Sequence, residues 1–168
     1  MVKEISSKQA SEFFNDTHIM GNGRSNYRLG LFFNNQLISA MSFSKNNLSR
    51  KIDNWELNRF SCLQNYHIMG GAGKLFNQFI NNIQPSKIVS YSDNRWSQGL
   101  VYEKLGFKKI SSGTPNYWYF LPNQNRIHRF NLRKNSNDNP DQTELENRTA
   151  QGYNRVWDSG SAKWIWSK

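Results

Sequence analysis

The chain has 168 residues, with 22 Lys and Arg against 12 Asp and Glu, so its formal charge is +10. Its single cysteine, Cys62, excludes an intramolecular disulfide framework and a cysteine-only zinc site, and it favours a reducing compartment. No apolar run approaches the ~18 residues that a membrane span needs, and the first residues lack the apolar segment of a signal peptide, so we expect a cytoplasmic protein without membrane contact.

The first part of the chain predicts one short helix and three strands. Apolar residues at helical spacing predict a helix over Ser7–Asn15. Alternating runs over Tyr27–Phe33 and Leu37–Phe43 predict an antiparallel hairpin, and Asp53–Leu63 predicts a third strand. Strict alternation in that strand divides its side chains between two faces: Glu56, Asn58, Phe60 and Cys62 on one, and Trp55, Leu57 and Arg59 on the other.

The middle of the chain alternates between helices and strands. The glycine-rich loop Gly70–Lys74 leads into an amphipathic helix that ends at Pro85, and Lys87–Ser92 predicts a short strand. A helix over Leu100–Leu105 ends at Gly106, and two further strands, Phe107–Ile110 and Tyr117–Leu121, flank the Gly113-Thr114-Pro115 turn. This order predicts an α+β fold with a mixed central sheet and flanking helices.

The composition changes after Pro122. Residues 123–139 are basic and poor in apolar side chains, which predicts a strand-like arm or linker. Thr143–Gly152 predicts a short helix with a capping box, and Tyr153–Trp166 predicts a terminal hairpin. We therefore divide the chain into a core over residues 1–122 and, over residues 123–168, a basic arm with a helix and hairpin appended to the core.

The glycine loop is the first candidate binding site. It follows a predicted strand and opens a helix, where unpaired backbone N–H groups and the helix dipole favour an anion such as a phosphate. Its spacing matches neither the P-loop nor the dinucleotide-binding fingerprint. A purely structural turn explains the loop about as well.

Two motifs together resemble the GCN5-related N-acetyltransferases (GNAT). His67-Ile68-Met69-Gly70-Gly71-Ala72 approximates their R/Q-x-x-G-x-G/A loop, with histidine at the first position, and Tyr102-Glu103-Lys104-Leu105-Gly106-Phe107 is similar to their tyrosine-helix signature. The resemblance covers about residues 27–121. It implies a GNAT-like fold and acetyl-CoA or a related acyl-CoA as donor. The cofactor-binding residues would be His67, Gly70, Gly71, Ala72, Gly73 and Lys74.

A narrower resemblance covers nearly the whole chain. Segments such as Asn15-Asp16-Thr17-His18-Ile19-Met20-Gly21, Trp55-Glu56-Leu57-Asn58-Arg59-Phe60 and Tyr91-Ser92-Asp93-Asn94-Arg95-Trp96-Ser97 resemble a bacteriophage domain related to acetyltransferases. That domain is similar to Mom-type proteins, which modify the adenine amine in DNA, and also occurs attached to homing-endonuclease-like proteins. The resemblance implies DNA as the partner, possible association with a phage nuclease, and the cytoplasm of an infected bacterial host.

The fold that the resemblance implies has a gap between the strand before the glycine loop and its parallel neighbour. Glu56, on a face that can line this gap, is the candidate base for the proton of an attacking amine. An ion pair with Arg59 or a solvated charge at the sheet edge is the equally weighted structural reading. Tyr102 matches the tyrosine that faces the leaving thiolate in the family, and its structural reading is a core aromatic.

Two further titratable residues are candidates for the same site. Asp93 follows a strand at the end where open α/β sheets place their ligands, so it could orient a base or an amine; a turn cap would look the same in the sequence. His18 lies in a loop that borders the acceptor in such folds, and histidine titrates near neutrality. A lone loop histidine is more often structural.

The positive charge favours a polyanionic partner, because Lys and Arg gain affinity for phosphates through counterion release; solubility is the alternative reading. Arg95 and Trp96 pair a cation with a ring that suits a flipped base. The candidate nucleic-acid contacts are Arg95, Trp96, Arg126, Arg129, Arg133 and Lys134.

These observations lead to three hypotheses. The first is a phage-type acyltransferase that modifies an amine on a DNA base, with Glu56, Asp93 or His18 handling the proton and Tyr102 the leaving group. The second is a non-catalytic DNA- or RNA-binding module with a degenerate GNAT fold. The third is an N-acetyltransferase for a protein or small-molecule amine. Three scattered histidines predict no metal site, and the oligomeric state is left open.

Overall fold

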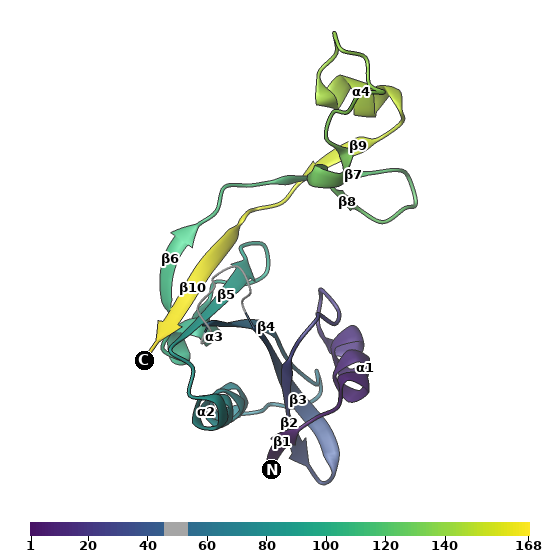
Figure 1. Cartoon of the computed structure of the whole chain (residues 1–168). Coiled ribbons are helices and arrows are strands. Elements are labelled where there is room, and N and C mark those ends of the chain that lie inside the picture. Colours follow the sequence, from purple (N-terminus) through teal and green to yellow (C-terminus); the bar gives the residue numbers. More distant parts are fainter. Residues whose placement is uncertain (46–53) are drawn as a thin grey trace.

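The computed structural model describes residues 1–45 and 54–168, which form an α+β fold with two sheets (Figure 1). The main sheet has the order β1-β2-β3-β4-β5-β10-β6, and the small sheet has the order β8-β7-β9. The elements are β1 (Val2–Glu4), α1 (Ser7–Thr17), β2 (Tyr27–Phe33), β3 (Gln36–Lys45), β4 (Asn54–Cys62), α2 (Gly71–Ile83), β5 (Lys87–Asp93), α3 (Leu100–Lys104), β6 (Lys108–Ser112), β7 (Tyr117–Phe120), β8 (Ile127–His128), the 3₁₀ helix η1 (Arg129–Leu132), α4 (Glu144–Ala150), β9 (Asn154–Trp157) and β10 (Ser161–Ser167). The predicted fold class is confirmed.

The core of the main sheet is aromatic. Phe79 of α2 stacks on Phe43 of β3 with ring centroids 3.6 Å apart, and Trp55 of β4 meets Phe79 edge-on at 5.2 Å. The helix carries its apolar residues at helical spacing, so one stripe faces the sheet. This packing fixes β4, the strand that carries most of the candidate site, against α2.

α1 covers the opposite face of the main sheet (Figure 1). It begins with a capping box between Ser6 and Gln9, and its buried residues Ala10, Phe13 and Phe14 pack against Ala40 of β3. β2 and β3 form the predicted antiparallel hairpin. The predicted third strand corresponds to β4, although its expected first residue, Asp53, lies outside the described residues. None of the described helices has the length and apolar character of a membrane span.

The pairing of the last strands differs from the expected hairpins. β10 does not pair with β9; it lies in the main sheet between β5 and β6, antiparallel to both. β7 does not pair with β6 either, and forms the small sheet with β8 and β9. The reason is long-range burial, because Trp164 of β10 is 1% exposed and stacks on Tyr102 of α3 with centroids 5.3 Å apart.

Residues 113–160, here called the extension, project away from the main sheet between β6 and β10 (Figure 1). The expected basic arm is only partly extended, because it contains the two-residue β8 and the 3₁₀ helix η1. The predicted helix is α4, and its Thr143–Glu146 capping box is present. Arg148 of α4 forms an ion pair with Asp138 at 2.7 Å, and these side chains are 3% and 2% exposed.

Candidate active site

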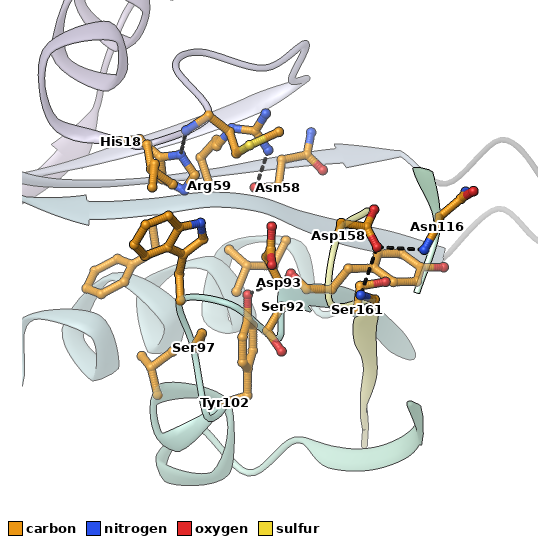
Figure 2. Close-up of a pocket in the computed structure, with 18 of the residues that line it drawn as sticks. His18, Asn58, Arg59, Ser92, Asp93, Ser97, Tyr102, Asn116, Asp158 and Ser161 are labelled. Atoms are coloured by element: carbon orange, nitrogen blue, oxygen red, sulfur yellow. Dashed lines mark hydrogen bonds between the residues drawn. The ribbon is translucent and has the colours of Figure 1, made fainter. Parts of the chain in front are cut away.

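A cavity of about 530 Å³ lies where β4 and β5 diverge (Figure 2). The parallel pairing of these strands runs from Asn54 and Lys87 to Leu57 and Ser90 and ends there. Beyond that point the backbone of each strand borders the gap, where its polar groups can bind a ligand. The lining residues come from the α1 loop, β4, β5, α3 and the extension: His18, Ile19, Met20, Leu57, Asn58, Arg59, Phe60, Tyr91, Ser92, Asp93, Trp96, Ser97, Val101, Tyr102, Thr114, Asn116, Asp158, Gly160 and Ser161.

A register shift in β4 turns Arg59 into this cavity. Ser42 pairs with Arg59 and Phe43 pairs with Leu57, so Asn58 is an extra residue on β4. The strict alternation expected from the sequence is therefore wrong beyond Leu57, since Phe60 packs against the core instead of sharing the Glu56 face. The Arg59 side chain donates to the carbonyl oxygens of Gly21 at 2.9 Å and Asn58 at 2.8 Å, which fixes the guanidinium at the cavity wall.

Tyr102 reaches the cavity from α3 at the end of the β4–β5 pairing. Its hydroxyl donates to the carbonyl oxygen of Tyr91 at 3.2 Å and lies 3.2 Å from the Ser90 hydroxyl, which in turn donates to the Leu57 carbonyl at 2.8 Å. Burial raises the pKa of Tyr102, with the Ser90 hydrogen bond and the Arg59 charge acting in the opposite direction. The phenol is therefore protonated at neutral pH, with its proton directed at the Tyr91 carbonyl, and its ring packs in the core.

Glu56 is half-buried on β4, opposite Val89 of β5, and is not among the residues that line the cavity. Burial raises the pKa of its carboxyl group, and the positive charge of Arg59 partly opposes this effect. Among the described residues, Glu56 forms no ion pair with Arg59, so the expected structural contact is absent. Its carboxylate interacts with the charge of Arg59, which lines the cavity, and a carboxylate with a raised pKa has the protonation behaviour of a general base.

Asp93 lines the cavity but is already paired. Both of its carboxylate oxygens accept from the Arg95 guanidinium, with Nε–Oδ1 at 3.0 Å, and Oδ1 also accepts from the Arg95 backbone N–H at 2.9 Å. The Arg95 hydrogen bond is the main reason why the pKa of Asp93 is lowered. Asp93 thus caps the turn after β5 and holds Arg95, while the neighbouring Trp96 lines the cavity with 66% of its surface exposed.

His18 caps the C-terminal end of α1 at the cavity wall. Its Nδ1 accepts from the Met20 backbone N–H at 3.1 Å, so the neutral ring carries its proton on Nε2. Burial, with a further contribution from the Arg59 charge, lowers the pKa of His18. The imidazole is therefore neutral at physiological pH. Figure 2 shows His18 and Arg59 on one side of the cavity, opposite Tyr102 and Asp93.

The glycine loop leaves the start of α2 open to an anion. Gly70 has a left-handed φ of 68°, and no side chain caps the helix N-terminus. A Cβ atom would meet nothing within 4 Å at Gly70 or Gly73, but at Gly71 it would lie 2.6 Å from Ile68 Cγ2. The first turn of a helix that no side chain caps can bind an anion such as a phosphate through its unpaired N–H groups.

The other predicted cofactor-binding residues, His67, Ala72 and Lys74, do not line the main cavity. His67 is exposed and does not line the main cavity. Ala72 is partly buried against the core, and the Lys74 N–H closes the first turn on the Gly70 carbonyl at 3.0 Å. The Lys74 side chain borders a second cavity beside Met1.

The four candidate nucleic-acid contacts in the basic arm have different partners. Arg126 lies 5.9 Å from the Trp118 ring, Arg129 lies 4.6 Å from the Tyr117 ring, and Arg133 lies 3.7 Å from the Phe130 ring. Lys134 donates to the carbonyl oxygens of Pro140 and Gln142. Strand alternation puts Trp118 and Tyr117 on opposite faces of β7, so Arg126 and Arg129 are also on opposite faces.

Sequence reasoning missed two cavity residues as functional groups. The sequence indicates Arg59 only as an ion-pair partner for Glu56. The alternation of residues along β4 does not reveal the bulge that turns Arg59 into the cavity. Asp158 falls within the segment for which the sequence predicts a terminal hairpin. It accepts from the backbone N–H groups of Asn116 and Gly160, both at 2.8 Å, and lines the cavity from the extension. A turn-forming Asp–Ser–Gly sequence does not predict which cavity it borders.

No family model and no curated protein sequence matches this chain. Solved structures do match it. The Escherichia coli ribosomal-protein-S18-alanine N-acetyltransferase has a TM-score of 0.60 and 10% identity, covering 99% of this chain and 92% of that one. A Bacillus subtilis acetyltransferase in complex with CoA has a TM-score of 0.57 and 10% identity, covering 99% and 97%. A GNAT acetyltransferase from Elizabethkingia anophelis with bound acetyl-CoA has a TM-score of 0.55 and 11% identity, covering 100% and 97%. The chain therefore has the GNAT fold.

Proposed function

We propose that this protein transfers an acetyl group from acetyl-CoA to an amine. The observation that carries the proposal is the Tyr102 hydroxyl, held by Ser90 and the Tyr91 carbonyl where the β4–β5 pairing ends and the cavity begins. The open glycine turn at the start of α2 supports it, because that turn fits the diphosphate of CoA. Similar structures with bound CoA or acetyl-CoA also support this donor.

The residues divide the chemistry between them. The donor supplies a thioester whose carbonyl carbon the amine attacks. Glu56, with its raised pKa, accepts the proton that the amine nitrogen loses. Tyr102, protonated at neutral pH, donates to the sulfur as the C–S bond breaks. Asp93 is too strongly paired with Arg95 to serve as the base, and it holds Arg95 at the turn beside the cavity.

His18 contributes to the same site as a hydrogen-bond donor. Its Nδ1 already accepts from the Met20 N–H, so the neutral ring presents only Nε2–H to the acceptor or to solvent. The lowered pKa of His18 keeps the ring neutral beside Arg59. Glu56 is therefore assigned as the base and His18 as a residue that orients the acceptor.

Calorimetric titration with acetyl-CoA and with CoA tests the donor. We expect saturable binding that is strongly weakened by Gly71→Leu, because the new side chain must displace Ile68 and distort the loop. Lys8→Leu, which places the same side chain at an exposed position of α1 outside the glycine loop, is the control and should leave the affinity within a fewfold of the parent. Absence of binding to either compound by the parent protein contradicts the proposal.

For the acceptor we propose an exocyclic amine of a DNA base. The formal charge of +10 and the exposed Trp96 ring on the cavity wall support this choice, because a flipped base needs a basic surface and an aromatic contact. Unstacking the base costs a few kcal/mol, so single-stranded DNA should react faster than duplex DNA.

The acceptor test uses isotopically labelled acetyl-CoA. The protein is incubated with single-stranded DNA, duplex DNA, a mixture of peptides or a panel of small amines, and the DNA is digested to nucleosides for mass spectrometry. An acetylated nucleoside is expected. Label in peptides or small amines alone identifies a protein or small-molecule N-acetyltransferase instead, and CoA binding without any product identifies a non-catalytic module.

A further inference from the structure

The extension places two guanidinium groups against one exposed aromatic pair. The Arg129 and Arg155 Cζ atoms lie 4.6 and 5.1 Å from the centroid of the Tyr117 ring, and Arg155 also lies 5.2 Å from the Trp157 ring. β7 and β9 pair Tyr117 directly with Trp157, whose ring centroids are 5.0 Å apart. We call these four residues the arginine–aromatic face.

The Tyr117 ring at the centre of this face is fixed by a hydrogen bond to α4. The Tyr117 hydroxyl donates to Glu144 Oε1 at 2.9 Å, and the Tyr119 hydroxyl donates to the same oxygen at 3.0 Å. Glu144 Oε1 of α4 thus accepts hydrogen bonds from two tyrosines of β7. Tyr117 therefore forms a fixed platform for the two arginines.

The outer groups of the face remain available to a ligand. Trp157 is 53% exposed, and both arginines are exposed. With the residues that the structure describes, neither Arg129 nor Arg155 forms an ion pair. A guanidinium stacked on a ring keeps its in-plane N–H groups free for phosphate oxygens.

We propose that the arginine–aromatic face binds a nucleic-acid single strand, with a base stacked on Trp157 and neighbouring phosphates on Arg129 and Arg155. A flat exposed ring beside cations fits alternating bases and phosphates better than it fits a purely anionic ligand. A duplex is disfavoured because its base faces are already stacked on one another. DNA and RNA share the required chemistry, so both are test ligands.

The arginine–aromatic face adjoins the cavity that lies where β4 and β5 diverge. Arg129 Nη1 lies 3.5 Å from Asn116 Oδ1, and Asn116 lines the cavity. Trp157 precedes Asp158, which lines the cavity from the other strand of the extension. A strand bound on this face is therefore held beside the cavity. The binding does not require acetyl transfer, so the inference goes beyond the proposed function while supplying a way to present its acceptor.

Fluorescence anisotropy with a labelled oligothymidylate of about 20 nucleotides, and with its ribonucleotide counterpart, tests the proposal in the full-length protein. We expect Trp157→Ala to weaken binding about tenfold or more, since a base–aromatic stack is lost. Arg155→Ala and Arg129→Ala should each weaken binding and reduce the slope of log K against log salt by about 0.7, the loss of one phosphate contact on a single strand. Trp157→Ala should leave that slope unchanged.

Two control variants separate this face from general charge and hydrophobicity. Lys8→Ala removes one exposed cation from α1, and Phe33→Ala removes an aromatic ring that is 56% exposed on β2. Both should keep the parent affinity. Equal losses in the control and face variants overturn the proposal, as do unchanged affinity in Trp157→Ala and Arg155→Ala or a duplex that binds as tightly as the single strand.

Titration of each variant with acetyl-CoA distinguishes this inference from the proposed function and also reports folding. Face variants that lose oligonucleotide binding but keep acetyl-CoA binding support the inference. If the parent protein binds acetyl-CoA but neither oligonucleotide, the inference is overturned and the proposed function is not. Face-dependent oligonucleotide binding without acetyl-CoA binding supports the inference and contradicts the proposed function.

Discussion

The main sheet is stabilised by stacked aromatic side chains, whereas the extension is held by hydrogen bonds to a few charged groups. In the main sheet, Phe79 packs between Phe43 and Trp55. In the extension, Arg148 joins α4 to the preceding loop through Asp138 and the Leu132 carbonyl. Apolar packing tolerates many sequences of similar volume, but a charged network depends on particular partners. The main sheet therefore depends mainly on apolar volume, and the extension depends on particular charged partners.

Removing the central aromatic ring of the main sheet should have the largest effect. Phe79→Ala is expected to cost about 3–5 kcal/mol of unfolding free energy, because it deletes a fully buried ring and leaves a cavity. Urea denaturation followed by circular dichroism measures the loss. A control at the exposed Phe33, changed to Ala, should alter the stability by much less, and equal effects at the two sites would contradict the aromatic account of the core.

Removing the Tyr102 hydroxyl tests whether this residue of the main domain donates the proton to the leaving sulfur. Tyr102→Phe should lower kcat about 100-fold, the range for loss of a general acid, while its ring still stacks on Trp164. Steady-state kinetics and a thermal melt distinguish the two roles. A parent-like kcat rules out Tyr102 as the donor to the leaving group, and a large drop in Tm with little change in kcat makes it a core residue.

The pH profile of the reaction reports on Glu56. Because burial raises its pKa, the carboxylate becomes protonated at a higher pH than an ordinary glutamate, so kcat/KM should fall as the pH is lowered through that raised pKa. Glu56→Gln should abolish this acid limb and lower kcat/KM at least tenfold. The matched control is Glu12→Gln, on the exposed side of α1. If Glu56→Gln keeps the acid limb of the parent pH profile, the titration belongs to another group.

The extension should be the acid-sensitive region, with a smaller and local effect. The Arg148 hydrogen bond lowers the pKa of Asp138 in the folded state, so the contact stabilises fully above the unfolded pKa of about 3.9 and fades as the pH falls through the lowered folded value. Hydrogen exchange at pH 5 and pH 3 should show lost protection in residues 132–148, with β4 and β5 protected at both values. Arg148→Met should expose the same segment already at pH 5, and an unchanged segment would contradict this account.

Much of the fold and part of the site follow from local patterns. Period and capping residues predicted α1, α2, α4 and the β2–β3 hairpin, because these depend on neighbours in the chain. The glycine turn and Tyr102 were identified from motifs of adjacent residues; the structure puts the turn at the start of α2 and Tyr102 at the cavity between β4 and β5. The assignment of Glu56 as the base is a prediction, which its pH profile tests.

The helices, most strands, the glycine turn and the tyrosine motif follow from the sequence, since each depends on residues a few positions apart. The entry of β10 into the main sheet, the bulge at Asn58 that turns Arg59 into the cavity and the pairing of Asp93 with Arg95 depend on the tertiary structure. It also decided that Arg155 and Trp157 join Arg129 around Tyr117. These features depend on which distant strands pair and on which side chains come together when they are buried. The local periodicity of the sequence predicts neither.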